Sequence, residues 1–233
     1  MNHERILEAA NPVLTEIIGN LIHIQIYLAG GYFKTLLSGL PVKDLDLWVP
    51  DKKTKHLLIQ SLLDRGAVII DDKPPFFIAL RFERNILEFP YNYDGLPMES
   101  CLSRFDIALS AIGVEYNCGR WKSFIHPSAA KSFKEKKLYL IHPFNNWKYA
   151  LVTLDRLNRY HRELNFEIVK AEVDYLWDLF DTQNLEEKIR MIKRYKNVPG
   201  WNQFTLKAAI TRVRQSKASL SKDFSFFDEI MIT

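Results

Sequence analysis

The chain has 233 residues, 47% of them hydrophobic and 13% aromatic, with a formal net charge of +4. This length fits one large domain or a domain with an extension, and the mild basicity permits an anionic partner without demanding one. Two widely separated cysteines, Cys101 and Cys118, argue against a disulfide framework and a cysteine zinc site. No apolar run approaches the ~18 residues of a membrane span, and the first residues lack the apolar core of a signal peptide, so we expect a cytoplasmic protein.

The first part of the chain mixes helices and strands. Apolar periodicity predicts helices at 3–20, 31–39, 52–64 and about 126–134. Period-two patterns and turn residues predict strands at 22–28, 44–49, 68–70, 76–82, 86–91, 104–116, 121–125 and 138–141, the last of them closing the sheet. Pro12 is expected to kink or interrupt the first helix, residues 92–100 are expected to form a loop, and Arg84-Asn85 is expected to turn a hairpin.

Beyond residue 142 the pattern is that of helices only. They are predicted at 147–164, 166–181, 184–195 and 202–217. We therefore expect an α+β head over residues 1–142 and an all-helical extension over residues 143–233. The last helix carries Lys207, Arg212 and Arg214 on its outer face, which could bind a nucleic-acid backbone or simply be solvated.

One stretch near the start combines a glycine pair with a carboxylate pair. Gly30-Gly31 ends an apolar strand and begins a helix, where backbone N–H groups suit a phosphate, although such a pair is also common in plain tight turns. Asp44 and Asp46 alternate with apolar residues, so they share one face of a strand. That face is either simply solvated or holds a divalent cation that offsets the carboxylate repulsion. Phosphate and metal together indicate nucleoside triphosphate chemistry.

The whole string, GGYFKTLLSGLPVKDLDL, resembles the GGxVRDxLLGxxxxDxD signature of the head domain of poly(A) polymerases and CCA-adding enzymes. The resemblance implies a polymerase-β-like nucleotidyltransferase head, with an NTP as substrate and Mg²⁺ or Mn²⁺ as cofactor. Gly30 and Gly31 would then cradle phosphates with help from Lys34. The family's Arg-Asp pair is replaced here by Lys34-Thr35, so a positive charge is kept and an acid is lost.

A third carboxylate should accompany the aspartate pair in two-metal chemistry, and the hairpin offers Glu83 and Glu88. Glu88 interrupts an apolar strand, where an unpaired acid would be costly to bury, and it falls where the family places its third acid. Glu83 is expected to be a solvated turn residue. We therefore assign Asp44, Asp46 and Glu88 as catalytic and metal-binding residues.

The next resemblance lies in Arg104-Phe105-Asp106, which is similar to the family's Arg-Arg-Asp motif. From the residues alone, Arg104 and Asp106 could equally form an ion pair. The resemblance implies that Arg104 contacts the triphosphate and that Asp106 orients nearby basic groups. Phe105 replaces the second arginine, which points to weaker nucleotide binding or a different substrate.

Residues 156–168, RLNRYHRELNFEI, are similar to the family's neck helix, where Arg156 and Arg159 share a face. That face is either solvated or turned toward the nucleotide. At the family's base-reading motif, one turn earlier, this chain has Tyr149, Ala150 and Thr153, and alanine cannot pair with a base edge. That mode of base selection is absent and the chain leaves little room for a tRNA-holding body, so CCA addition is not expected.

The sequence thus predicts transfer of NMP from an NTP to an acceptor hydroxyl, with an RNA or tRNA 3′ end as the favoured acceptor. Two alternatives stay open. One is a nucleotidyltransferase that modifies a protein or a small molecule, and the other is a non-catalytic nucleotide-binding protein. No membrane partner is expected.

Overall fold

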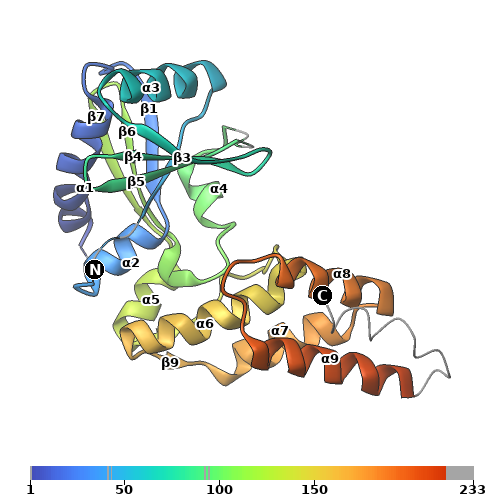
Figure 1. The fold of residues 1–233 in the computed structure, drawn as a ribbon. Helices are drawn as coiled ribbons and strands as arrows, with labels where there is room; N and C mark the ends of the chain where they lie inside the picture. Colours follow the sequence, from blue (N-terminus) through green and yellow to red (C-terminus); the bar gives the residue numbers. More distant parts are fainter. Residues whose placement is uncertain (1, 41, 43, 92, 94, 219–233) are drawn as a thin grey trace. The chain divides into compact units, whose positions relative to one another are not determined.

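The computed structural model describes residues 2–40, 42, 44–91, 93 and 95–218 (Figure 1). The chain divides into two compact units, Met1–Asn145 with Tyr160–Val169, and Asn146–Arg159 with Lys170–Thr233. The helix α6 (Ala150–Leu164) contributes residues to both units. The division into a head over residues 1–142 and an extension over residues 143–233 stays a prediction.

The first unit is built on a mixed sheet, which has seven strands within the described residues. Its strands are β1 (Gln25–Ala29), β2 (Asp44–Trp48), β3 (Val68–Lys73), β4 (Phe77–Phe82), β5 (Asn85–Pro90), β6 (Ile112–Asn117) and β7 (Arg120–Ile125). They are ordered β3-β4-β5-β2-β1-β6-β7. The strand β2 pairs antiparallel with β1 and parallel with β5. A mixed sheet with flanking helices confirms the predicted α+β class, and the predicted hairpin is β4–β5.

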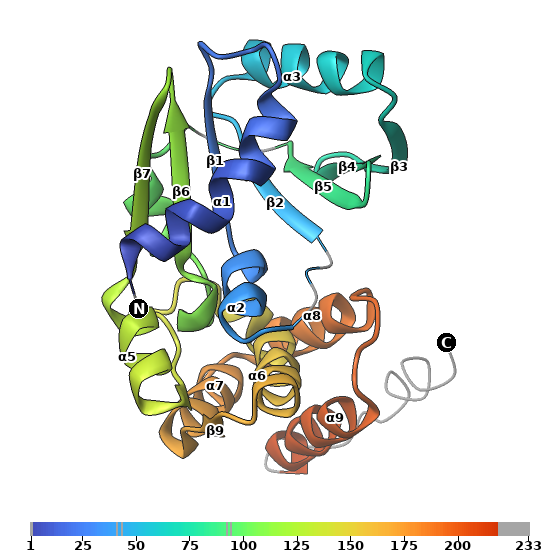
Figure 2. The same cartoon turned by 90° about the vertical axis from the view of Figure 1, so that its left-hand side faces the viewer.

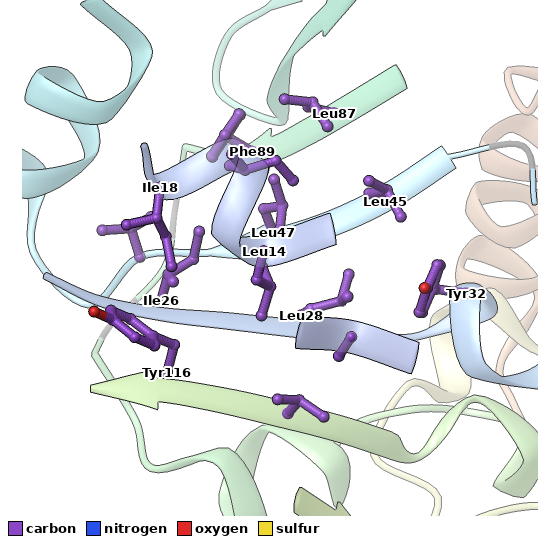
Figure 3. Packing of buried hydrophobic residues seen from close by; sticks show 14 of the residues in the cluster. Leu14, Ile18, Ile26, Leu28, Tyr32, Leu45, Leu47, Leu87, Phe89 and Tyr116 are labelled. Atoms are coloured by element: carbon purple, nitrogen blue, oxygen red, sulfur yellow. The ribbon is translucent and has the colours of Figure 1, made fainter. Parts of the chain in front are cut away.

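One face of this sheet carries the hydrophobic core (Figure 3). Alternation along β2 sends Leu45 and Leu47 to that face, and Leu87 and Phe89 follow from β5. These side chains are fully buried with Leu14 of α1 (His3–Ile18). Because successive side chains alternate, the same packing sends Asp44, Asp46 and Glu88 to the opposite face.

Two long helices of the first unit begin at side-chain caps. Asn2 caps α1, which continues through Pro12 to Ile18, so Pro12 does not interrupt the helix, and the kink stays a prediction. The side chain of Asp51 accepts a hydrogen bond from the Thr54 N–H at the start of α3 (Lys52–Asp64). Figure 2 shows α1 crossing the sheet on the side of β6 and β7. The remaining helices are α2 (Gly31–Leu37), α4 (Met98–Leu102), the 3-10 helix η1 (Ala108–Ser110) and α5 (Pro127–Glu135).

Two predictions for this region are corrected. The expected loop at 92–100 contains the start of α4, while residues 92 and 94 and the predicted turn at Pro41 lie outside the described residues. The expected strand at 104–116 contains η1, and its strand β6 begins only at Ile112.

A second, two-stranded sheet corrects two further expectations. The strand β8 (Lys137–Leu138) pairs in parallel with β9 (Glu167–Ile168) and does not close the large sheet. The extension is therefore not all-helical. Asn165 has φ +55°, which ends α6 at Leu164, and the Glu167 N–H then donates to the Lys136 carbonyl over 2.9 Å.

The second unit is helical in its described part. It contains η2 (Trp147–Tyr149), the first part of α6, α7 (Lys170–Asp181), α8 (Leu185–Lys196) and α9 (Gln203–Ala218). Asp155 of α6 accepts hydrogen bonds from the Tyr195 hydroxyl, the Asn202 N–H at 3.0 Å and the Thr205 hydroxyl at 2.5 Å, and these bonds tie α6, α8 and α9 together. Arg212, predicted to face outward, pairs with Asp181. None of the described helices is both long and apolar enough to cross a membrane.

Candidate active site

Three predicted catalytic carboxylates lie side by side on the sheet face opposite the core. Asp44 and Asp46 are two residues apart on β2, and Asp46 is paired in register with Glu88 on the parallel neighbour β5. Residues paired in register share a face of the sheet. Asp44 is exposed, whereas Asp46 and Glu88 are half-buried. The structure thus brings Glu88 from a separate part of the sequence to the aspartate pair.

Gly30 lies directly against this cluster. Its φ is +85°, a backbone conformation that residues with a side chain rarely adopt. A Cβ built on Gly30 would lie 2.4 Å from Oδ2 of Asp46. Gly31, the first residue of α2, has open space at the same position. The strand-to-helix turn and the β2 carboxylate therefore form one compact group. A phosphate-binding role for these two glycines stays a prediction.

The carboxyl group of Glu88 is perturbed by its surroundings. Burial raises its pKa above the ordinary value, and the negative charges of Asp44 and Asp71 raise it further. Lys73 opposes this shift and also pairs with Asp71. Asp71 and Lys73 lie on the edge strand β3, two strands from β5. They escaped the sequence analysis because their closeness to Glu88 depends on the β3–β4–β5 register.

A raised pKa makes Glu88 a destabilising charge near neutral pH. Well below pH 4.5, its ordinary pKa, Glu88 is protonated in both the folded and the unfolded chain and contributes nothing. As the pH rises, the unfolded chain releases this proton first, so the folded state loses stability until Glu88 also ionises there. Glu88→Gln should remove that loss. We expect the variant to be at least as stable as the wild type near neutral pH.

Urea unfolding without divalent cations, at about pH 3 and about pH 7, measures this effect. The stability advantage of Glu88→Gln should be present near neutral pH and vanish in acid. Glu83→Gln, at the β4–β5 turn, is the matched control and should show no such difference. A Glu88→Gln variant that is less stable than the wild type near neutral pH would contradict the expectation.

Lys34 is engaged by the end of α6. Its side chain is 8% exposed, its Nζ donates to Oε2 of Glu163 over 2.7 Å, and it lies 4.0 Å from the centre of the Tyr160 ring. The Tyr160 hydroxyl in turn lies 2.9 Å from the Ser110 hydroxyl. This ion pair, made within the first unit, ties α2 to the residues after 160. A phosphate would have to compete with Glu163 for the ammonium group, and the predicted phosphate contact of Lys34 stays a prediction.

The Lys34–Glu163 pair should contribute measurably to stability. Glu163→Gln removes the counter-charge of a buried ammonium group. Because Glu163 is 28% exposed, we expect a cost of about 1–3 kcal/mol, between the values for exposed and fully buried pairs. Lys34→Met together with Glu163→Gln should cost less than the sum of the two single changes.

Chemical denaturation of the four proteins of this cycle measures the coupling. Asp174→Asn breaks the exposed Lys170–Asp174 pair and serves as control, with an expected change of about 0.5 kcal/mol or less. Strict additivity of the Lys34 and Glu163 changes would show that the pair does not stabilise the fold.

The remaining predicted site residues are placed as follows. Arg104 is exposed just after α4. Asp106 is buried, and its carboxylate accepts a hydrogen bond from the Ile107 N–H over 2.8 Å. Arg156 and Arg159 lie on the part of α6 that belongs to the second unit. Their roles in nucleotide binding stay predictions. Ala150 and Thr153 are completely buried, so neither offers a polar group to a base.

An aromatic group beside the acids was not foreseen as part of the site. Trp48 follows Asp44 and Asp46 at the next alternate position of β2, so it shares their face. Its ring centre lies 6.2 Å from that of Phe105 and 5.4 Å from that of Tyr93. The Phe105 ring reaches within 3.5 Å of the position of a Cβ on Gly30. The alternate spacing of Asp44, Asp46 and Trp48 on one strand could have placed this ring beside the acids from the sequence alone.

Carboxylate oxygens are the ligands that Mg²⁺ and Mn²⁺ prefer, so the donor chemistry of Asp44, Asp46 and Glu88 fits a hard divalent cation. Their in-register placement on adjacent strands gives all three access to the same side of the sheet. In their present rotamers, however, no group of three His, Cys, Asp or Glu side chains in the described part of the chain is arranged to hold a metal ion.

Comparison with known proteins shows the fold. No protein-family model matches the chain, and no curated protein sequence does. Among solved structures, a CCA-adding enzyme in complex with ATP is 14% identical, with a TM-score of 0.59 over 99% of this chain and 57% of that one. A tRNA nucleotidyltransferase in complex with a primer tRNA and an ATP analogue is 18% identical, with a TM-score of 0.55 over 90% and 62%.

A third solved structure, the Thermotoga maritima CCA-adding enzyme in complex with tRNA, is 13% identical, with a TM-score of 0.54 over 94% of this chain and 54% of that one. The chain thus spans a little over half the length of these proteins. Structural similarity at such low sequence identity shows the fold alone. The fold of this chain is that of the CCA-adding and tRNA nucleotidyltransferases, as the resemblance in its glycine and aspartate string predicted.

Proposed function

We propose that this chain is a metal-dependent nucleotidyltransferase that transfers NMP from an NTP to an acceptor hydroxyl, with the 3′ end of an RNA as the acceptor. The observation that carries the proposal is the packing of Gly30 against Asp46, with Asp44 and Glu88 beside it on one sheet face. Structural neighbours with the same fold include a tRNA-processing enzyme, a tRNA nucleotidyltransferase in complex with an ATP analogue and a CCA-adding enzyme in complex with ATP.

The reaction makes a bond between the acceptor oxygen and the α-phosphorus and breaks the bond from that phosphorus to the pyrophosphate leaving group. Asp44, Asp46 and Glu88 would hold Mg²⁺ or Mn²⁺, which neutralises charge on the phosphates when bound. Gly30 and Gly31 bring backbone N–H groups to the phosphates, and Arg104 and Lys34 supply positive charge. Glu88 accepts the proton of the attacking hydroxyl as a general base.

Base selection would differ from that of CCA addition. Ala150 has no polar side-chain group and the hydroxyl of Thr153 is buried, so neither residue offers a group to a base edge. We therefore propose that the enzyme does not build the CCA sequence and discriminates weakly among bases. Arg156, Arg159 and Asp106 complete the proposed nucleotide-binding set.

A transfer assay tests the proposal. The protein is incubated with each α-labelled NTP and Mg²⁺, together with total RNA, lysate protein or a small-molecule extract. Label in the RNA fraction, lost with Asp46→Asn, supports the proposal. Label in protein or small molecules instead overturns the RNA acceptor and leaves nucleotidyl transfer in place. Absence of label from every fraction, with wild type and Asp46→Asn alike, overturns the enzymatic function.

A further inference from the structure

An aromatic ring occupies the position where the resembled family has a second arginine. Phe105 is half-buried and lies between α4 and η1. Its ring approaches the same glycine position that Oδ2 of Asp46 approaches, at 3.5 Å and 2.4 Å respectively. A bound nucleotide whose phosphates lie at Gly30 would therefore have an aromatic neighbour in place of a guanidinium group.

The ring belongs to a group of neighbouring aromatic side chains. Trp48 meets Phe105 at a tilt of 58°, and Tyr93 meets Trp48 nearly edge-on at 80°. Tyr27 meets Tyr93 edge-on as well, and the group packs on a buried cluster that includes Met98. Such packing restricts the Trp48 ring that backs Phe105, so little side-chain freedom should be lost when a ligand binds.

A phenyl ring does not attract phosphate, but it offers a face on which a planar heterocycle can stack. Every nucleobase has such a face, so stacking strengthens binding with little dependence on which base is bound. Stacking of this kind is consistent with the burial of Ala150 and Thr153, which leaves neither residue able to contact a base edge. In one nucleotide the ribose alone separates the base from the α-phosphate, so the same ligand can contact both Phe105 and the acid cluster.

We propose that Phe105, backed by Trp48, forms a stacking subsite for a nucleobase beside Asp46. The subsite rests on the proposed function, because its ligand is a nucleotide at the acid cluster. The base belongs either to the incoming NTP or to the terminal nucleotide of an RNA acceptor, and both have the same stacking chemistry.

Binding measurements with the full chain test this subsite. We would titrate wild type, Phe105→Leu and Phe105→Trp with non-hydrolysable analogues of ATP and CTP, with a short single-stranded oligoribonucleotide and with tripolyphosphate, all in Mg²⁺. Phe105→Leu should weaken nucleotide binding about tenfold, with a larger loss for the purine, and leave tripolyphosphate binding unchanged. Phe105→Trp should restore the affinity. Phe133→Leu, which alters a half-buried ring set edge-on to Phe166 elsewhere in the first unit, is the matched control.

Each outcome decides between the subsite and its absence. A loss confined to the oligoribonucleotide also supports the subsite, with the acceptor base as its occupant. Equal affinities of wild type and Phe105→Leu for the nucleotide analogues and for the oligoribonucleotide alike would overturn it, as would an equal loss of tripolyphosphate binding. The transfer assay separates these failures from a failure of the proposed function: a wild type that transfers label while Phe105→Leu binds normally refutes only the stacking subsite. A wild type that neither binds nor transfers any nucleotide refutes both.

Discussion

Asp44→Asn is expected to reduce NMP transfer by on the order of 1,000-fold without destabilising the protein. Asp44 is exposed at the start of β2, so an amide of the same shape can replace its carboxylate without disturbing the core. The activity is lost because an amide carries no negative charge for a cation. Asp46→Asn should behave in the same way, since Asp46 is the acid paired in register with Glu88.

The stability change is expected to have the opposite sign to the activity change. The Asp44 charge raises the pKa of Glu88, so these two carboxylates repel each other in the folded state. Removing one charge should leave the free energy of unfolding unchanged or higher, which is common at sites that give up stability for activity. Transfer rates and urea unfolding of the same preparation measure both quantities.

Glu83→Gln is the matched control for the aspartate variants, because Glu83 is an exposed acid at the β4–β5 turn. It should retain wild-type transfer. Addition of Mg²⁺ should raise the unfolding temperature of the wild type and of Glu83→Gln but not that of Asp44→Asn. Full activity of Asp44→Asn would refute the assignment of this carboxylate to catalysis.

Gly30→Ala is expected to damage both activity and stability. The new methyl group would lie 2.4 Å from Oδ2 of Asp46, and φ at this position is +85°. Adopting that backbone conformation with a side chain costs about 1–3 kcal/mol, before any cost of moving the carboxylate. Because the carboxylate must shift to relieve the overlap, we expect transfer to fall at least about 100-fold.

Gly31→Ala provides the comparison one residue along the chain. Nothing lies within 4 Å of a Cβ at this position, and Gly31 is already the first residue of α2. The stability of Gly31→Ala should stay close to that of the wild type, because helix propensity favours alanine at this position. Thermal unfolding and transfer rates measured side by side test the contrast. Equal effects of the two substitutions would show that contact with Asp46 is not what requires glycine at position 30.

Local patterns were sufficient to predict the carboxylate pair and its setting. The alternation of aspartates with Leu45 and Leu47 predicted which face of β2 is apolar, and burial of both leucines confirms it. The glycine pair between a strand and a helix was predicted in the same way, since Gly30 precedes α2. These features depend on neighbours within a few residues, where side-chain periodicity and backbone preference act directly.

Short elements escaped prediction for a physical reason. The helix α4 has five residues, too few to show a helical period, and it is stabilised by burying Met98. A Cβ on Gly113 would lie 2.7 Å from Sδ of Met98, so this packing depends on a residue of β6. Likewise, β8 and β9 are two residues long and acquire their conformation from each other.

The sequence by itself determined the fold class, the glycine turn and the common face of Asp44 and Asp46. Only the tertiary structure decided which partners each of these groups has. The parallel register of β2 with β5 places Glu88 beside Asp46. The contact of α2 with the end of α6 allows Lys34 to pair with Glu163, 129 residues away. The placement of Phe105 against Gly30 is of the same kind. Contacts between distant segments depend on how whole elements bury their apolar faces, and no local pattern encodes that choice.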